Sequence, residues 1–249
     1  MLWSRHEGIG PRLVLVHGFT QTHACWGDLV GPLSIGHEII AVDAPGHGHS
    51  ARIQVDLARG ATLLGEAGGH AVYLGYSMGG RLCLHLALAN PTLVRALIVV
   101  GASGGIEDEA ARHERVRLDE ARARQLESQG LDAFLGDWLA QPMFAKVPER
   151  ARCIEARLSN TVEGLASSLR LAGTGSQQPL WTRLHTLTMP VLVIAGANDL
   201  PYVSQARRMG DMIGDNATVS IIPEAGHTAH LEQPEAFLDV VRAWLASIA

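Results

Sequence analysis

Short apolar stretches alternate with longer segments of mixed polarity over most of the chain. Apolar runs of this length are typical of buried strands, and they cover residues 12–16, 38–42, 71–74, 96–100, 191–195 and 218–222. Helical periodicity follows in the segments 23–33, 55–67, 78–89 and 234–246. Because strands and helices alternate, we predict an α/β fold with a mostly parallel central sheet and helices on both faces.

This pattern changes between residues 106 and 181, where strand signals disappear. Charged helical periodicity covers residues 107–128, 131–140, 148–158 and 163–172. We therefore predict a core made of residues 1–105 and 182–249, with residues 106–181 inserted as a helical cap. In the first of these helices, one face carries Ala111, Arg115, Leu118, Arg122 and Gln125. We expect this face to point inward, so its arginines need either an anionic ligand or a structural ion pair.

Composition narrows the class of protein. The chain has 249 residues, 47% hydrophobic and 18% charged, which suits one large domain with a substantial core. A net charge of −5 argues against a general nucleic-acid surface. No apolar run reaches the length of a membrane helix, and the N-terminal residues lack the apolar core of a secretory signal. Cys25, Cys83 and Cys153 form no CxxC pair, so we expect reduced thiols and a cytoplasmic location.

The candidate chemistry begins at Ser77, in the sequence Gly75-Tyr76-Ser77-Met78-Gly79. A strand, a G-x-S-x-G turn and a helix together predict a nucleophilic serine on a tight, strained bend. The two glycines let the strand and the helix approach closely. Taken alone, the motif is also compatible with a glycine-rich turn whose serine only faces solvent.

Two later residues complete a catalytic pattern. Asp199 and His227 each follow a predicted strand, as Ser77 does, and strand ends of a parallel sheet meet at one edge. We predict that His227 takes the serine proton and that Asp199 orients the imidazole. Weaker alternatives are Asp211 and Asp215 for the acid and His230, more plausibly a supporting residue, for the base.

The loop after the first apolar run, His17-Gly18-Phe19-Thr20, is a candidate source of oxyanion donors. The backbone N–H groups of Phe19 and Met78 would hold the charge, unless the loop is an ordinary connection. His47-Gly48-His49 resembles a metal motif but lacks neighbouring ligands, and residues 101–105 lack the GKS or GKT ending of a phosphate loop. We therefore predict neither a metal nor a cofactor. His23 either lines a pocket or has a capping or surface role.

Several segments resemble the α/β-hydrolase superfamily over nearly the whole chain: HGF at 17–19, DAPGHGHS at 43–50, GYSMGG at 75–80, GANDLP at 196–201 and EAGHTAHLEQPEAF at 224–237. The resemblance implies an α/β-hydrolase fold with an inserted helical cap. A narrower resemblance is to the 2-succinyl-6-hydroxy-2,4-cyclohexadiene-1-carboxylate synthases, the MenH family. It rests on GYSMGGR and on the cap segments GGIEDEAARHERVRLDEARA, FLGDWLAQPMFA and ARLSN. Residues 101–103 differ from the family pattern.

The narrower resemblance implies that Arg81, Arg115 and Arg157 bind the carboxylates of a small substrate, with Tyr76, Trp138 and Gln141 in the same pocket. It also implies a carbon–oxygen lyase that eliminates pyruvate during menaquinone synthesis, without a cofactor. For Arg81, a purely structural ion pair is the alternative. The residues alone lead only to a serine hydrolase for an ester, a thioester or a carbon–carbon bond, or to a binding protein on this scaffold. They leave the choice between monomer and homo-oligomer open.

Overall fold

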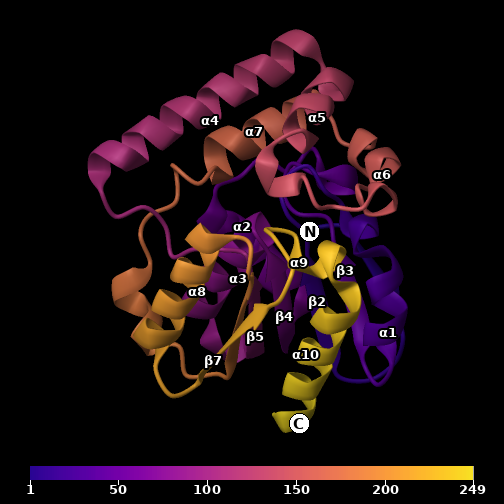
Figure 1. Cartoon of the computed structure of the whole chain (residues 1–249), viewed down its shortest axis with the longest axis vertical. Helices are drawn as coiled ribbons and strands as arrows, with labels where there is room; N and C mark the ends of the chain where they lie inside the picture. Colours follow the sequence, from indigo (N-terminus) through magenta and orange to yellow (C-terminus); the bar gives the residue numbers. More distant parts are fainter. Residues whose placement is uncertain (249) are drawn as a thin grey trace.

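A computed structural model describes residues 1–248 and contains a seven-stranded sheet in the order β1-β3-β2-β4-β5-β6-β7 (Figure 1). Strand β1 pairs with β3 in the antiparallel sense, and every other pairing is parallel. The strands are β1 (Ser4–Glu7), β2 (Arg12–Val16), β3 (Glu38–Val42), β4 (Ala71–Tyr76), β5 (Val94–Val100), β6 (Val191–Gly196) and β7 (Ala217–Ile222). The predicted mostly parallel α/β sheet is confirmed.

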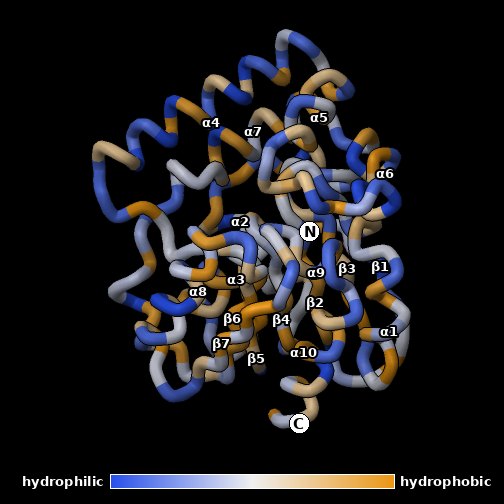
Figure 2. Tube along the Cα trace, in the orientation of Figure 1, coloured by the Kyte–Doolittle hydropathy of each residue, from blue (hydrophilic) through white to orange (hydrophobic). Residues whose placement is uncertain are grey.

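Helices cover both faces of the sheet. One face packs against α2 (Leu57–Gly68), α3 (Met78–Ala89) and α8 (Leu200–Ile213). The other packs against α1 (Val30–Ser34), the preceding 3₁₀ turn (His23–Leu29) and α10 (Pro234–Ser247). Alternate residues of β2 join opposite sides, because successive strand side chains point to opposite faces. Figure 2 shows the resulting concentration of hydrophobic chain in the strands and the helix faces against them.

Strand β1 is absent from the sequence-based prediction. Its residues, SRHE, are polar and largely exposed, so the pattern of a buried strand is missing. The segment is a strand because it pairs in register with β3, with Ser4 opposite Val42 and Glu7 opposite Ile39. Tertiary pairing, not local propensity, determines this edge.

Between β5 and β6 the chain forms the cap, by which we mean α4 (Glu109–Gln129), α5 (Leu131–Leu139), α6 (Ile154–Leu158) and α7 (Val162–Ala172). Figure 1 shows these helices together at the top of the view, beyond one end of the sheet. The two ends of the insertion are joined: Leu180 N donates to Gly104 O at 2.7 Å, and Trp181 Nε1 donates to Gly105 O at 2.8 Å. The division at residues 106 and 181 stays a prediction.

The inward face predicted for α4 is wrong in part. Leu118 is 48% exposed, and Ala111 is exposed as well. The buried residues are Asp119, Ala123 and Leu126, whose stripe packs on α7 and α5. The apolar pattern placed the buried face wrongly because one of its three residues, Asp119, is an acid. The arginines at 115 and 122 lie half-buried beside that stripe, and those at 117 and 124 are largely exposed. Across residues 1–248, no helix combines the length and the apolarity that crossing a membrane requires.

Candidate active site

Ser77 lies on the sharp bend between β4 and α3. Its backbone has φ 51° and ψ −109°, a region that a side chain disfavours by about 1–3 kcal/mol. The bend requires glycine on both sides. A Cβ on Gly79 would lie 2.1 Å from the carbonyl oxygen of Val16, and one on Gly75 would lie 2.4 Å from that of Gly79. The expected tight, strained turn is therefore present.

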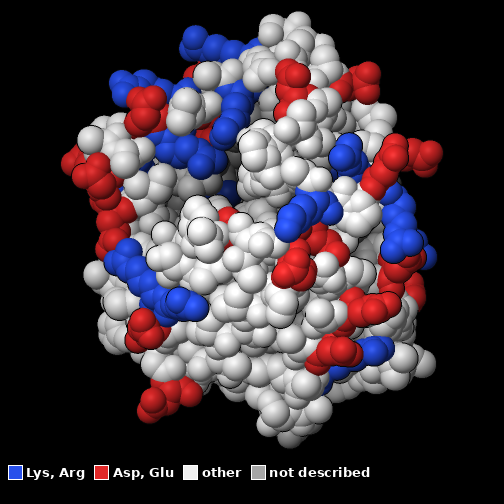
Figure 3. All heavy atoms as spheres, viewed as in Figure 1, with Lys and Arg blue, Asp and Glu red and all other residues white. Residues whose placement is uncertain are grey.

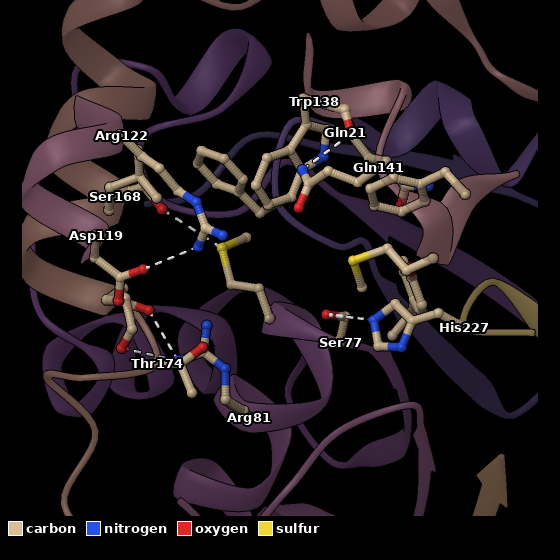
Figure 4. A pocket seen from close by; sticks show the side chains of 18 of the residues that line it. Gln21, Ser77, Arg81, Asp119, Arg122, Trp138, Gln141, Ser168, Thr174 and His227 are labelled. Carbon is tan, nitrogen blue, oxygen red and sulfur yellow. Dashed lines mark hydrogen bonds and ion pairs between the residues drawn. The ribbon is translucent and has the colours of Figure 1, made fainter. Parts of the chain in front are cut away.

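The structure brings Ser77, Asp199 and His227 together (Figure 4 shows Ser77 and His227). The His227 Nδ1 atom lies 2.7 Å from Asp199 Oδ2, and its Nε2 atom lies 3.3 Å from Ser77 Oγ. Since a carboxylate only accepts, Nδ1 carries the proton and Nε2 is free to accept from the serine. The weaker acid candidates, Asp211 and Asp215, are exposed.

His230 has a packing role in this arrangement. Its buried ring lies 4.4 Å from the Tyr76 ring and 5.1 Å from the Trp26 ring, measured between centroids. Burial lowers the pKa of His230 to about 3, so the ring is neutral near pH 7. Tyr76 in turn lies 5.5 Å from His227, which connects His230 to the site through a buried aromatic contact.

The two N–H groups predicted to hold an oxyanion, those of Phe19 and Met78, are not used in the fold of the described residues. The N–H of Phe19 has no hydrogen-bond partner within residues 1–248. The N–H of Met78 belongs to the first residue of α3, where helical N–H groups have no acceptor within the helix. The neighbouring loop is fixed, since Gly18 N donates to Gln21 Oε1 at 3.0 Å.

Two buried histidines hold this loop, and sequence reasoning missed their role. His47 Nε2 accepts from Thr20 N at 3.3 Å, and its Nδ1 bonds Pro45 O at 2.9 Å. His17 Nε2 accepts from Ala44 N at 3.0 Å. Burial lowers the pKa of His17 to about 4 and that of His47 to about 3, so both are neutral acceptors at pH 7. In the His47-Gly48-His49 motif, His47 therefore holds the loop of residues 17–20 in place.

His23 and His49 share the carboxylate of Asp43. Their Nδ1 atoms lie 2.9 and 3.0 Å from its two oxygens, which also accept the backbone N–H groups of the same two histidines. This is the one cluster within residues 1–248 with the composition of a metal site. Each carboxylate oxygen already has two donors, so the cluster is explained as a hydrogen-bonded turn. His23 therefore has a structural role.

A pocket lies beside Ser77 between the sheet edge and the cap. Four arginines line it: Arg81 from α3, Arg115 and Arg122 from α4, and Arg157 from α6. Figure 3 shows Lys and Arg side chains gathered around a hollow on the cap side of this face. In Figure 4, Arg81 and Arg122 reach toward the space that Ser77 faces. The pocket is positively charged although the whole chain carries a net charge of −5.

Arg81 is buried, with 8% of its surface exposed, and it donates only to backbone carbonyls. Its Nη1 atom lies 2.9 Å from Ala172 O and 3.2 Å from Gly173 O. Within residues 1–248 no carboxylate lies within 4.0 Å of its guanidinium. Burial lowers the pKa of Arg81 to about 10, so it remains charged at pH 7. Within residues 1–248, Arg81 therefore does not form the structural ion pair that the sequence left open.

Arg115 and Arg122 share a buried acid. Arg115 Nε lies 2.8 Å and Arg122 Nη1 3.6 Å from Asp119 Oδ1. The second oxygen of Asp119 accepts from Gly175 N at 3.2 Å. The two side chains are 31% and 32% exposed, so each retains free donors on the pocket side. Sequence reasoning placed both arginines on one face but did not assign Arg122 to the pocket.

Arg157 is buried and links the cap to the oxyanion loop. Its Nε donates to Arg152 O at 2.7 Å, and its Nη1 donates to the hydroxyl of Thr20. Asn160 supports the same contact, because its Nδ2 donates to Thr20 O at 2.8 Å. Arg157 therefore both lines the pocket and fixes the loop that carries Phe19.

The remaining predicted pocket residues also lie in the lining. The Trp138 ring lies 5.1 Å from the Phe19 ring, and its buried Nε1 has no hydrogen-bond partner within residues 1–248. Gln141 Nε2 donates to Trp138 O at 3.0 Å, which leaves its oxygen available. Tyr202, which was missed, lies 4.5 Å from the His227 ring at the start of α8. Its place three residues after Asp199 was the available signal.

Comparisons with known proteins agree with this geometry. A model of the "Alpha/beta hydrolase family" matches residues 13–240. A Bacillus subtilis (strain 168) protein, provisionally named 2-succinyl-6-hydroxy-2,4-cyclohexadiene-1-carboxylate synthase, is 35% identical over 95% of this chain and 90% of its own. The synthase of that name from Photorhabdus laumondii is 32% identical over 95% and 86%. The structure of MenH from S. aureus superposes with a TM-score of 0.90 at 28% identity, covering 98% of both chains. The chain therefore belongs to the alpha/beta hydrolase family and, within it, to the group of the 2-succinyl-6-hydroxy-2,4-cyclohexadiene-1-carboxylate synthases.

Proposed function

We propose that this chain is a carbon–oxygen lyase of menaquinone biosynthesis. It eliminates pyruvate from 2-succinyl-5-enolpyruvyl-6-hydroxy-3-cyclohexene-1-carboxylate. The observation that carries the proposal is the pocket itself, in which four arginines surround the space beside Ser77. A small substrate with several carboxylates fits that charge, and the relatives named as synthases support the same reaction.

Ser77 acts as the base in this proposal. His227 Nε2, 3.3 Å from Ser77 Oγ, takes the hydroxyl proton as the oxygen removes a substrate proton next to activated unsaturation. Asp199 stabilises the imidazolium that forms, through its 2.7 Å contact with Nδ1. The electron pair released by the broken C–H bond expels the enolpyruvyl group as the enolate of pyruvate, which becomes pyruvate when it takes up the proton held by the His227 imidazolium.

Negative charge develops on the succinyl carbonyl during proton removal. The N–H groups of Phe19 and Met78 stabilise it, because donors fixed in advance need no reorganisation during the reaction. The supports described for the loop, His47 and Arg157, keep Phe19 in position. Removing the His47 support is therefore expected to slow turnover although His47 is not in the pocket lining, whereas a change at Arg157 would affect both the loop and the pocket.

The carboxylates of the substrate bind the arginines. Arg81 offers a cation that no acid within residues 1–248 neutralises, and a guanidinium binds a carboxylate through paired donors. Arg115 and Arg157 complete the set that the family resemblance implies. We add Arg122, because it lines the same space and retains exposed surface.

Hydrolysis of an ester or a carbon–carbon bond is the second candidate, favoured by the serine–histidine–aspartate geometry itself. Release of pyruvate from the enolpyruvyl substrate, measured beside turnover of p-nitrophenyl esters, separates the two. We expect rapid pyruvate release that falls at least about 10³-fold in Ser77→Ala. Fast ester turnover without pyruvate release would overturn the lyase. Wild-type activity in Ser77→Ala would overturn the role of the serine in either reaction.

A further inference from the structure

Two cysteines that are far apart in the sequence meet at the junction of core and cap. Cys25 lies in the 3₁₀ turn that follows the oxyanion loop, and Cys153 immediately precedes α6 of the cap. The Sγ atom of Cys153 lies 3.9 Å from the carbonyl oxygen of Cys25, across 128 positions of sequence. We propose that Cys25 and Cys153 form a reversible disulfide that fastens α6 to the core.

Cys153 has an unusual backbone conformation, and its Sγ atom also lies 3.2 Å from Ala151 O. Cys153 has φ 55° and ψ 42°, the left-handed region, which is uncommon for a residue other than glycine or asparagine. Strained residues of this kind persist only where the surrounding structure holds them, and they cluster at functional sites.

Both thiols line a second cavity, separate from the pocket beside Ser77. Its wall includes Trp26, Leu231 and Ile154, and it opens to solvent. Cys153 is half-buried, whereas Cys25 is only 2% exposed. A small oxidant can therefore reach Cys153 first, and Cys25 is placed to react with the product.

The electrostatics couple the two thiols in the reduced protein. The interaction with the Cys153 thiol lowers the pKa of Cys25 to about 7, and the same interaction raises the pKa of Cys153, so in the reduced pair the thiolate lies on Cys25. Cys25 Sγ also accepts the backbone N–H of Thr22 at 3.4 Å, which stabilises its negative charge. The remaining cysteine, Cys83, is fully buried in α3, and burial raises its pKa.

The oxidant in the proposal is a low-molecular-weight disulfide, represented by oxidised glutathione. Cys153, the more exposed thiol, passes its proton to the neighbouring Cys25 thiolate as its sulfur attacks one glutathione sulfur, which forms a mixed disulfide and releases one glutathione thiolate. Cys25 then gives this proton to the released glutathione thiolate, attacks Cys153 Sγ as a thiolate and releases the second glutathione thiolate. The protein loses two electrons and two protons, and one oxidised glutathione becomes two reduced molecules. In a reducing compartment such a bond is transient, as expected of a redox-sensing pair.

Peptide mapping tests the bond. After treatment of the full chain with oxidised glutathione, tryptic peptides 13–52 and 153–157 should be joined, while peptide 82–95, which contains Cys83, stays free. Reduction should separate them. Cys25→Ser and Cys153→Ser should each abolish the joined peptide, and Cys83→Ser should retain it. Glutathione left on Cys153 without a joined peptide, or joining only between two molecules, would overturn the proposal.

The effect of the disulfide on the attachment of α6 can be measured separately from its formation. A cross-link over so long a loop restricts the unfolded chain, so Tm of the oxidised form should rise by about 5–15 °C. Amide exchange in residues 154–158 should slow on oxidation in the wild type and in Cys83→Ser. Equal Tm and equal exchange in both redox states would show that the bond, once formed, fastens nothing.

Discussion

Among single residues, Arg81 separates binding from stability most clearly. It is buried, charged and bonded only to two carbonyl oxygens, so the folded protein gains little from its charge. In Arg81→Met we expect kcat/KM for the carboxylate substrate to fall about 10- to 100-fold, the loss of a charge-assisted hydrogen bond of about 1.5–3 kcal/mol. We expect Tm to stay within a few degrees of wild type.

The matched control for this variant is Arg117→Met, which alters an exposed arginine on the outer face of α4. It should change neither kcat/KM nor Tm. If Arg81→Met unfolds the protein, or turns over at the wild-type rate, the arginine is structural.

We predict that His47, which holds the loop of residues 17–20, makes the stability of the protein depend on pH. Burial holds its folded pKa at about 3, below the ordinary value of 6.5, so the unfolded chain binds the proton more tightly. The contribution of neutral His47 is therefore complete above pH 6.5 and is lost as the pH falls from 6.5 toward 3. We expect the free energy of unfolding, measured in urea at pH 7 and pH 5, to fall less in His47→Gln than in the wild type. Equal losses would contradict the role of His47.

The proximity of Ser77, Asp199 and His227 could be predicted from the sequence, because each residue follows an apolar strand and the ends of parallel strands share one edge of the sheet. The role of His47 could not be predicted, because its hydrogen bond to Thr20 joins two loops 27 positions apart in the sequence. The pattern around His47 suggested only a turn. Contacts between loops leave no periodic trace, so residues that support the oxyanion loop were identified only in three dimensions.

Individual elements show the same contrast between local pattern and packing. Strands β2 and β3 have the predicted bounds because their side chains are almost all buried. The sequence did not predict strand β1 or the buried face of α4, because each depends on the segment against which it packs. For α4 that segment is the turn at Gly173 and Gly175, which approaches Asp119 closely.

The packing of this turn on α4 can be tested with a glycine pair. A Cβ on Gly175 would lie 2.5 Å from the backbone N of Val116, so Gly175→Ala should destabilise the protein by about 1–3 kcal/mol. In Gly136→Ala, within α5, nothing lies within 4 Å of the new methyl, and a gain of about 0.5–1 kcal/mol is expected. Urea denaturation compares the two, and equal effects would contradict the close packing.

For the whole molecule, the distribution of charge matters more than its sum. Four arginines meet in one pocket of a chain whose net charge is −5. A polyanionic substrate should therefore be attracted to the pocket mouth, most strongly at low ionic strength, where the Debye length is about 30 Å at 0.01 M and about 8 Å at 0.15 M. We expect kcat/KM to fall as KCl is added across this range.

The salt dependence should be shallower in Arg122→Gln, which removes one of the more exposed pocket cations. Arg124→Gln, which changes an outward-facing arginine of the same helix, should retain the wild-type slope. A kcat/KM that does not respond to salt would contradict attraction by the pocket.

The pairing of Asp119 with two pocket arginines has a consequence for specificity. Its carboxylate holds the guanidinium groups of Arg115 and Arg122 in place before any ligand arrives, as a resident counter-ion. An incoming anion thus meets donors whose conformational freedom is already reduced, and loses less entropy in ordering them. The same acid repels a ligand that brings its negative charge to the wrong corner. A single buried carboxylate in this way both pre-orders the arginines for the correct polyanion and selects against anions whose charges are arranged differently.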